Sequence, residues 1–110
     1  MYIPDKWEII KFCDNKKTWF KVLASWYGGY MDCENYRLSS GLVDIIDNPD
    51  YYLMKNISGS EYKCYKNQIG LINISNSVLN RLQNLGKENN INIEICSIDE
   101  FQKHKEKICN

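Results

Sequence analysis

Residues 18–26, TWFKVLASW, constrain the fold more than any other stretch of this chain. Phe20, Val22, Ala24 and Trp26 occupy every second position, which is the pattern of a β-strand whose successive side chains leave opposite faces of a sheet. A pair of glycines follows at 28–29, where the backbone can turn or approach another group closely. A strand bounded in this way favours a fold built on a sheet.

Similar short segments recur through the first 70 residues, separated by polar turns. Neighbouring strands usually pair, so these segments predict an antiparallel meander. Small residues at Ser39, Ser40 and Gly41 predict a bulge or bend that could divide the third strand into two pieces. The expected strands cover residues 6–13, 18–26, 36–46, 51–57 and 61–66.

The pattern changes after residue 70, where apolar residues at spacings of three and four predict an amphipathic helix. Ser75 or Ser77 could cap this helix, and Gly86 is expected to end it. Alternating isoleucines over 91–95 predict a further strand, and Ser97-Ile98-Asp99-Glu100 has the spacing of a capping box for a last helix. The predicted fold is therefore α+β, in a single domain of residues 1–110: an antiparallel β-meander of about five strands, then a helix, a further strand and a short C-terminal helix.

Charge and cysteine content limit the classes of partner. The chain has 14 basic and 14 acidic residues and a net charge of zero, so duplex DNA and anionic membranes are poor candidates. Its five cysteines are odd in number and show no C-x-x-C spacing, which indicates reduced thiols in a cytoplasmic protein. No apolar run approaches the roughly 20 residues that span a bilayer. We expect no bound cofactor.

No catalytic signature stands out, and we expect the protein not to be an enzyme. Cys33 or Cys64 with His104 would supply a nucleophile and a base. However, His104 lies in the charged segment HKEK and is expected to be solvated. The three aspartates around Pro49 lack the spacing of an EF-hand, and a zinc site lacks both paired cysteines and further histidines.

Two segments carry candidate binding groups. The first surrounds the glycine pair and combines tyrosines and a tryptophan, which can stack on bases, with one of only two arginines in the chain. The second offers serine hydroxyls and backbone N–H groups to a phosphate or carboxylate, without the fingerprint of a P-loop or dinucleotide site. The alternative is structural: buried aromatics, a bulge and a hairpin turn. The candidate ligand-binding residues are Trp26, Tyr27, Tyr30, Tyr36, Arg37, Ser39, Ser40, Ser58, Ser60, Tyr62 and Lys63.

Four motifs together resemble a group of small, mostly uncharacterised phage and prophage proteins. They are W-Y-G-G-Y at 26–30, Y-R-L-S-S-G at 36–41, Y-Y at 51–52 and S-G-S-x-Y-x-C at 58–64. The resemblance covers about residues 2–82, and it departs at Tyr36 and Ser39, where the group commonly has Trp and Asn. It implies a phage accessory protein, active in the bacterial host cytoplasm, that counters host immunity by binding a defence protein or sequestering a nucleotide signal.

Our leading hypothesis is non-catalytic binding of a small phosphorylated or nucleotide ligand. One alternative is inhibition of a host defence complex through an aromatic surface. Another is binding of single-stranded nucleic acid, because Lys63 and Lys66 interleave with Tyr62 and Tyr65. The surplus of aromatic and apolar residues also predicts a homo-oligomer, most simply a two-fold dimer. Its interface would use residues 51–66 and the aromatic loop, with the 91–95 strand as an alternative edge.

Overall fold

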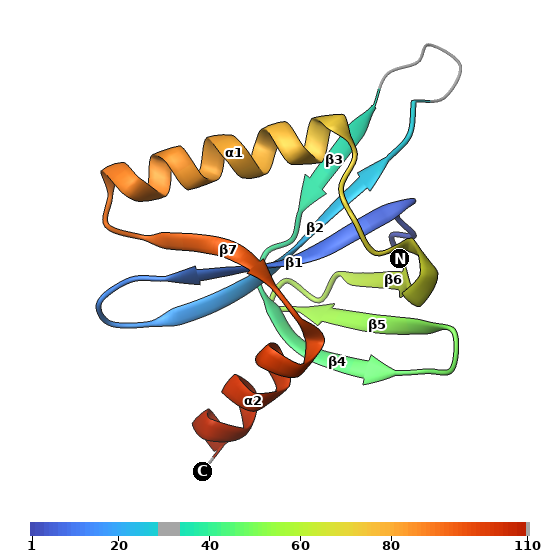
Figure 1. Ribbon diagram of the computed structural model, residues 1–110. Coiled ribbons are helices and arrows are strands. Elements are labelled where there is room, and N and C mark those ends of the chain that lie inside the picture. The colour runs from blue at the N-terminus through green and yellow to red at the C-terminus, as the bar shows by residue number, and fades with distance from the viewer. Residues whose placement is uncertain (29–33, 110) are drawn as a thin grey trace.

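The structure is a computed structural model that describes the backbone of residues 1–28 and 34–109. Its α+β class and its order of strands, helix, strand and helix confirm the prediction (Figure 1). Tyr30 and Cys33 lie outside the described residues. The elements are β1 (Lys6–Cys13), β2 (Thr18–Trp26), β3 (Asn35–Leu38), β4 (Leu42–Asp47), β5 (Tyr51–Asn56), β6 (Glu61–Tyr65), a 3₁₀ turn (Lys66–Gln68), α1 (Asn73–Glu88), β7 (Asn92–Cys96) and α2 (Ile98–Cys109).

The strands form two antiparallel sheets, which the expected single meander did not anticipate. One sheet has the order β3-β2-β1-β7 and the other β4-β5-β6. The division occurs at Ser39, whose N–H donates to the Val22 carbonyl (2.9 Å) and whose hydroxyl accepts from the Val22 N–H (2.8 Å). Ser39 thus continues the pairing of β3 with β2, and the chain then turns into the second sheet. The predicted bulge is a corner where one strand switches sheets.

The N-terminal segment joins the two sheets on their other side. Tyr2 N–H donates to the Glu61 carbonyl (2.9 Å), and Lys63 N–H donates to the Tyr2 carbonyl (2.8 Å). Tyr2 therefore extends the second sheet beside β6, whereas Lys6 onward belongs to β1 of the first sheet. The sheets are connected along both sides and enclose an interior like an incomplete barrel.

Apolar side chains fill both faces of the four-stranded sheet. The face towards the second sheet carries Phe20, Val22 and Ala24, at the alternate positions that the sequence predicted. The opposite face packs against Val78 and Leu79 of α1, which covers it in Figure 1. Because both faces are buried, apolar residues occur at both parities of β1 and β2. The interior cluster contains Trp7, Ile9, Phe20, Val22, Ala24, Leu42, Ile45, Met54, Tyr62, Cys64, Cys96 and Phe101.

The predicted boundaries of α1 were wrong at both ends. The cap position is Ile72, whereas Ser75 lies inside the first turn, where its hydroxyl accepts from the Ile72 N–H (2.8 Å) and donates to the Ile72 carbonyl (3.2 Å). Gly86 does not end the helix, which continues to Glu88. A β-carbon at Gly86 would lie only 2.5 Å from the Ile91 carbonyl oxygen. Glycine is required here by the close return of the chain towards β7.

Ser97 caps α2 as predicted, because its hydroxyl accepts from the Glu100 N–H (3.1 Å). In a full capping box the Glu100 side chain would bind the backbone N–H of Ser97. Here the Glu100 carboxylate instead forms an ion pair with the Lys11 ammonium of β1, at 2.7 Å. Within the described part of the chain, no helix is long and apolar enough to cross a membrane.

Candidate functional site

The predicted ligand-binding residues that the structure describes do not form a single site. Trp26, Arg37 and Tyr62 come together at the end of β2, beside Tyr2. The three serines at 40, 58 and 60 form a second group, and Lys63 lies on the outer face of the second sheet.

Arg37 is held on a stack of two tyrosine rings. Its guanidinium carbon lies 4.4 Å from the centroid of the Tyr2 ring, and that ring stacks on Tyr62 with centroids 4.9 Å apart. Burial raises the pKa of the Tyr62 hydroxyl, and the neighbouring positive charge of Arg37 partly opposes this rise. Tyr62 is therefore neutral at ordinary pH, and the stack is an uncharged aromatic support beneath an exposed guanidinium.

A small pocket of about 240 Å³ opens beside this guanidinium. Trp26 forms one wall, fixed by a hydrogen bond from its indole N–H to the Ile3 carbonyl (2.9 Å) and by edge-to-face packing on Tyr2. Asn35 lies directly opposite Trp26 in the β2–β3 register and adds a side-chain amide. The pocket is lined by Tyr2, Trp26, Asn35, Tyr36 and Arg37.

Arg37 has no carboxylate partner among residues 1–28 and 34–106. The ion pairs of this part of the chain use Lys11, Lys55, Lys66 and Lys105 instead. An arginine has five N–H donors in a planar fork and no acceptor, and its preferred partners are phosphate and carboxylate groups. The arrangement can therefore hold an anion.

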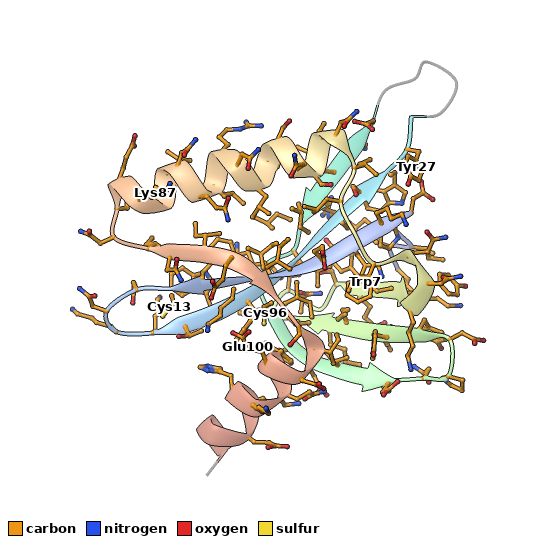
Figure 2. The ribbon with its side chains drawn as sticks, viewed as in Figure 1. Trp7, Cys13, Tyr27, Lys87, Cys96 and Glu100 are labelled. Atoms are coloured by element: carbon orange, nitrogen blue, oxygen red, sulfur yellow. The ribbon has the colours of Figure 1, made fainter. Side chains whose placement is uncertain are left out.

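Tyr36 and Tyr27 do not face this guanidinium as expected. Tyr36 and Arg37 are successive residues of β3, so their side chains leave opposite faces of the strand, and Tyr36 is directed to the side that carries α1. Tyr27, labelled in Figure 2, is 53% exposed and follows β2, with its backbone N–H bound to the Asp5 carboxylate (2.9 Å). Stacking by both tyrosines on one ligand beside Arg37 does not follow from this geometry.

The serines bond mainly to one another and to the backbone. Ser40 and Ser58 hydroxyls are 2.9 Å apart, and Ser58 and Ser60 hydroxyls 3.0 Å apart, so they tie the corner before β4 to the β5–β6 turn. Ser39 is 2% exposed and its hydroxyl is bound to Val22. None of these serines lines the Arg37 pocket. These contacts fit the alternative in which the serines only stabilise a bend and a hairpin turn.

The outer lysines lie over tyrosine rings. Lys63 Nζ is 4.6 Å from the Tyr51 centroid and 5.2 Å from that of Tyr65. Lys66 Nζ lies 4.8 Å from the centroid of Tyr52, whose ring packs against the interior cluster, and pairs with Asp47 at 2.6 Å. On the outer face, a base could stack on the ring faces of Tyr51 and Tyr65 that Lys63 covers only after this lysine had moved, which weakens the case for a single-stranded nucleic acid there.

The cysteine and histidine chemistry considered from sequence gains no support. Burial raises the pKa of the Cys64 thiol far above its ordinary value, so the nucleophilic thiolate is not formed at neutral pH. The expectation that His104 is solvated was wrong: its ring packs edge-to-face on Phe20 (5.1 Å), and its Nε2 atom is buried with no hydrogen-bond partner among the side chains of residues 1–28 and 34–106. Within the described residues, no group of three metal-ligating side chains comes together.

Sequence reasoning missed Tyr2 and Asn35. Tyr2 reaches the site only through its pairing with β6, about sixty residues away in the chain, and no local pattern signals such a contact. Asn35 could be placed only once the β2–β3 register was known. Comparison of the chain with family models, with curated proteins and with solved structures gave no match.

Proposed function

We propose that this protein binds a small phosphorylated or nucleotide ligand without converting it, and that Arg37 receives the anionic group. One observation carries the proposal: an exposed guanidinium stacked on Tyr2, beside a pocket, with no carboxylate partner among residues 1–28 and 34–106. Hydrogen bonds between a guanidinium and a phosphate are charge-assisted and stronger than neutral ones.

The size of the pocket determines which part of a ligand it holds. At about 240 Å³ it is smaller than the ~300–1,000 Å³ of pockets that enclose a whole drug-sized molecule. We expect the anionic end to enter and a planar ring to lie outside, where it can stack on the free face of the guanidinium. The Asn35 amide can donate to the same anion or to the ring.

The resemblance to phage accessory proteins favours a nucleotide immune signal of the bacterial host as the ligand. Sequestration needs affinity and stoichiometric amounts of protein, with no turnover. The absence of a reactive thiolate at Cys64 is compatible with such a role.

The first experiment identifies the ligand. Protein purified from bacteria is denatured, and the released small molecules are analysed by mass spectrometry. Pooled nucleotides and cyclic dinucleotides are tested in parallel by thermal shift. The proposal expects a stoichiometric phosphorylated compound or a saturable rise in melting temperature. Protein that is consistently empty and that no candidate stabilises would contradict it.

Exposed apolar residues on β4 and in the turn between β5 and β6 support a second candidate function, inhibition of a partner protein. Val43, Ile46 and Ile57 are 46%, 40% and 74% exposed, and β4 is an edge strand. Exposed apolar clusters at sheet edges are typical contact surfaces. A stoichiometric bacterial partner that is lost with Val43→Asp and retained with Arg37→Gln would favour this function.

A further inference from the structure

A second pocket of about 530 Å³ lies between the two sheets, at the opposite end of β2 from Trp26. Its volume falls in the range of sites that enclose small molecules. The serine and glycine at 40–41 form part of its rim, and most of its other walls are apolar. The apolar side chains of these walls are Phe20, Leu42, Val43, Ile57 and Phe101. Trp19 also borders the pocket, but its ring stacks on Phe12 on the opposite face of the sheet.

Helix α2 closes one side of this inter-sheet pocket, where it lies beside β4 in Figure 1. Phe101 is buried and packs perpendicular to Phe20, with centroids 5.0 Å apart. Lys105 is joined to Asp44 of β4 by an ion pair, which holds the helix against the second sheet. The wall is therefore fixed by both apolar and charged contacts.

A more polar hollow adjoins the inter-sheet pocket. It shares Lys17, Thr18 and His104 with the pocket, and Asp14, Asn15 and Lys16 form its remaining walls. The Nε2 atom of His104, which is buried and has no hydrogen-bond partner in the described part of the chain, thus belongs to the boundary between an apolar and a polar compartment. A molecule that occupied both compartments would have an apolar body and a polar end.

The charges at this boundary favour an anion. Lys17 Nζ lies 5.1 Å from the Trp19 ring centroid and forms no ion pair within residues 1–28 and 34–106. The Asp14 carboxylate is engaged by the backbone N–H groups of Lys16 and Lys17, each at 2.8 Å. Lys105 and Asp44 neutralise each other. The remaining charged residues are Lys16, Lys17 and Asp14, which leave one net positive charge at the mouth of the inter-sheet pocket.

We propose that the inter-sheet pocket is a separate site for a small amphipathic anion. The hydrocarbon body lies against Phe20, Leu42 and Ile57. Its carboxylate or phosphate is met by the exposed Lys17 side chain, whose ammonium moves to the mouth of the pocket from its place over the Trp19 ring. This site is independent of the one at Arg37, because the two lie at opposite ends of β2 and share no lining residue.

Straight-chain carboxylates test the apolar half of the proposal. Hexanoate, octanoate and decanoate are titrated below the concentrations at which they form micelles, by calorimetry and by the NMR signals of the Phe20 and Phe101 rings, which line the pocket. The affinity is expected to rise about fourfold for each added methylene until the pocket is full, the factor that corresponds to ~0.8 kcal/mol per buried CH₂. An affinity independent of chain length, or no saturable binding of decanoate, would overturn the proposal.

Decanol and two lysine variants test the charged half. Lys17→Met is expected to weaken decanoate about fivefold, the effect of ~1 kcal/mol for an exposed ion pair, and to leave decanol unchanged. Lys87→Met on α1, far from the pocket, should change neither ligand. Equal weakening of both ligands by Lys17→Met would refute the assignment of the anion to Lys17.

A further pair of variants locates the site and separates it from Arg37. Ile57→Ala should weaken decanoate and decanol alike, whereas Ile95→Ala, another exposed isoleucine, should weaken neither. Circular dichroism confirms that each variant is folded. Decanoate binding that resists Ile57→Ala and is lost with Arg37→Gln would place the ligand at the other site and overturn the proposal.

Discussion

Replacement of Gly86 by alanine tests the close approach of α1 to β7. In an ordinary helix interior this change stabilises by roughly 1 kcal/mol, because alanine has the higher helix propensity. Here the new β-carbon would lie 2.5 Å from the Ile91 carbonyl oxygen and 2.9 Å from Ile93 Cδ1. The Gly86 carbonyl also accepts from the N–H groups of Asn89 (3.0 Å) and Ile91 (2.8 Å), so the return of the chain resists displacement.

We expect Gly86→Ala to destabilise the protein by about 1–2 kcal/mol. A clash with a backbone atom costs ~2–3 kcal/mol, the upper part of the range for overpacking, and this exceeds the gain of about 1 kcal/mol in helix propensity. For a domain of this size, that corresponds to a fall in Tm of roughly 4–8 °C. Thermal unfolding followed by circular dichroism measures the change. Asn80→Ala, at an exposed position of the same helix, serves as control and should be neutral or slightly stabilising. An unchanged or higher Tm for Gly86→Ala would refute the reasoning.

Three further predictions concern an ion pair, the thiols and assembly. The Lys105 contact lowers the pKa of Asp44, so the ion pair stabilises the folded state above the unfolded-state pKa of about 3.9, and this stability is lost as the pH falls. Asp44→Asn should lower the free energy of unfolding by under about 1 kcal/mol at pH 7 and should flatten the acid side of a plot of Tm against pH. Burial raises the pKa of Cys96 to about 11 and raises that of Cys64 further, so neither thiol forms the reactive thiolate readily. Peptide mapping after brief alkylation should therefore find the less buried Cys13 modified before Cys64 and Cys96, and equal labelling of the three would contradict this. Size exclusion with light scattering should give twice the 13.0 kDa chain mass, and a monomer at micromolar concentration would refute the predicted dimer.

The edges of the sheets change the interface that we expect for the dimer, which the sequence placed at residues 51–66 and the aromatic loop or at the 91–95 strand. β7 is an edge strand, and the Gln83 side chain of α1 donates to its Ile93 carbonyl (3.1 Å). A protein that covers an edge acceptor with its own side chain reduces pairing at that edge. The exposed residues Val43 and Ile46 leave β4 as the better candidate for contact between copies.

Local patterns predicted the elements well because each element is encoded by its own neighbours. The alternation over Phe20, Val22 and Ala24 predicted a strand correctly, and the structure shows that this set of side chains faces the interior. Ser97 capped α2 as expected, since a cap depends on residues three positions apart. The division into two sheets could not be predicted, because it depends on the bonds of Ser39 to Val22 and of Tyr2 to β6.

The candidate site was predicted only in part for the same reason. Arg37, Trp26 and Tyr62 were all among the candidate residues, but the sequence placed Tyr62 in a different segment from the other two. Nothing in the sequence showed that Tyr2 would lie between the guanidinium and Tyr62. The inter-sheet pocket was missed because its walls come from β2, β4, the β5–β6 turn and α2. His104 was misplaced because a charged local segment gave no sign of its packing on Phe20.

The most direct test of the account compares the two arginines of the chain. A nucleotide or phosphorylated compound that stabilises the protein is titrated by calorimetry into the unchanged chain, Arg37→Gln and Arg81→Gln, where Arg81 lies exposed on α1. The account predicts a loss of at least about tenfold in affinity with Arg37→Gln, since a hydrogen bond to a charged group contributes ~1.5–3 kcal/mol, and no change with Arg81→Gln. Equal affinity in all three proteins would contradict the assignment of the ligand to Arg37.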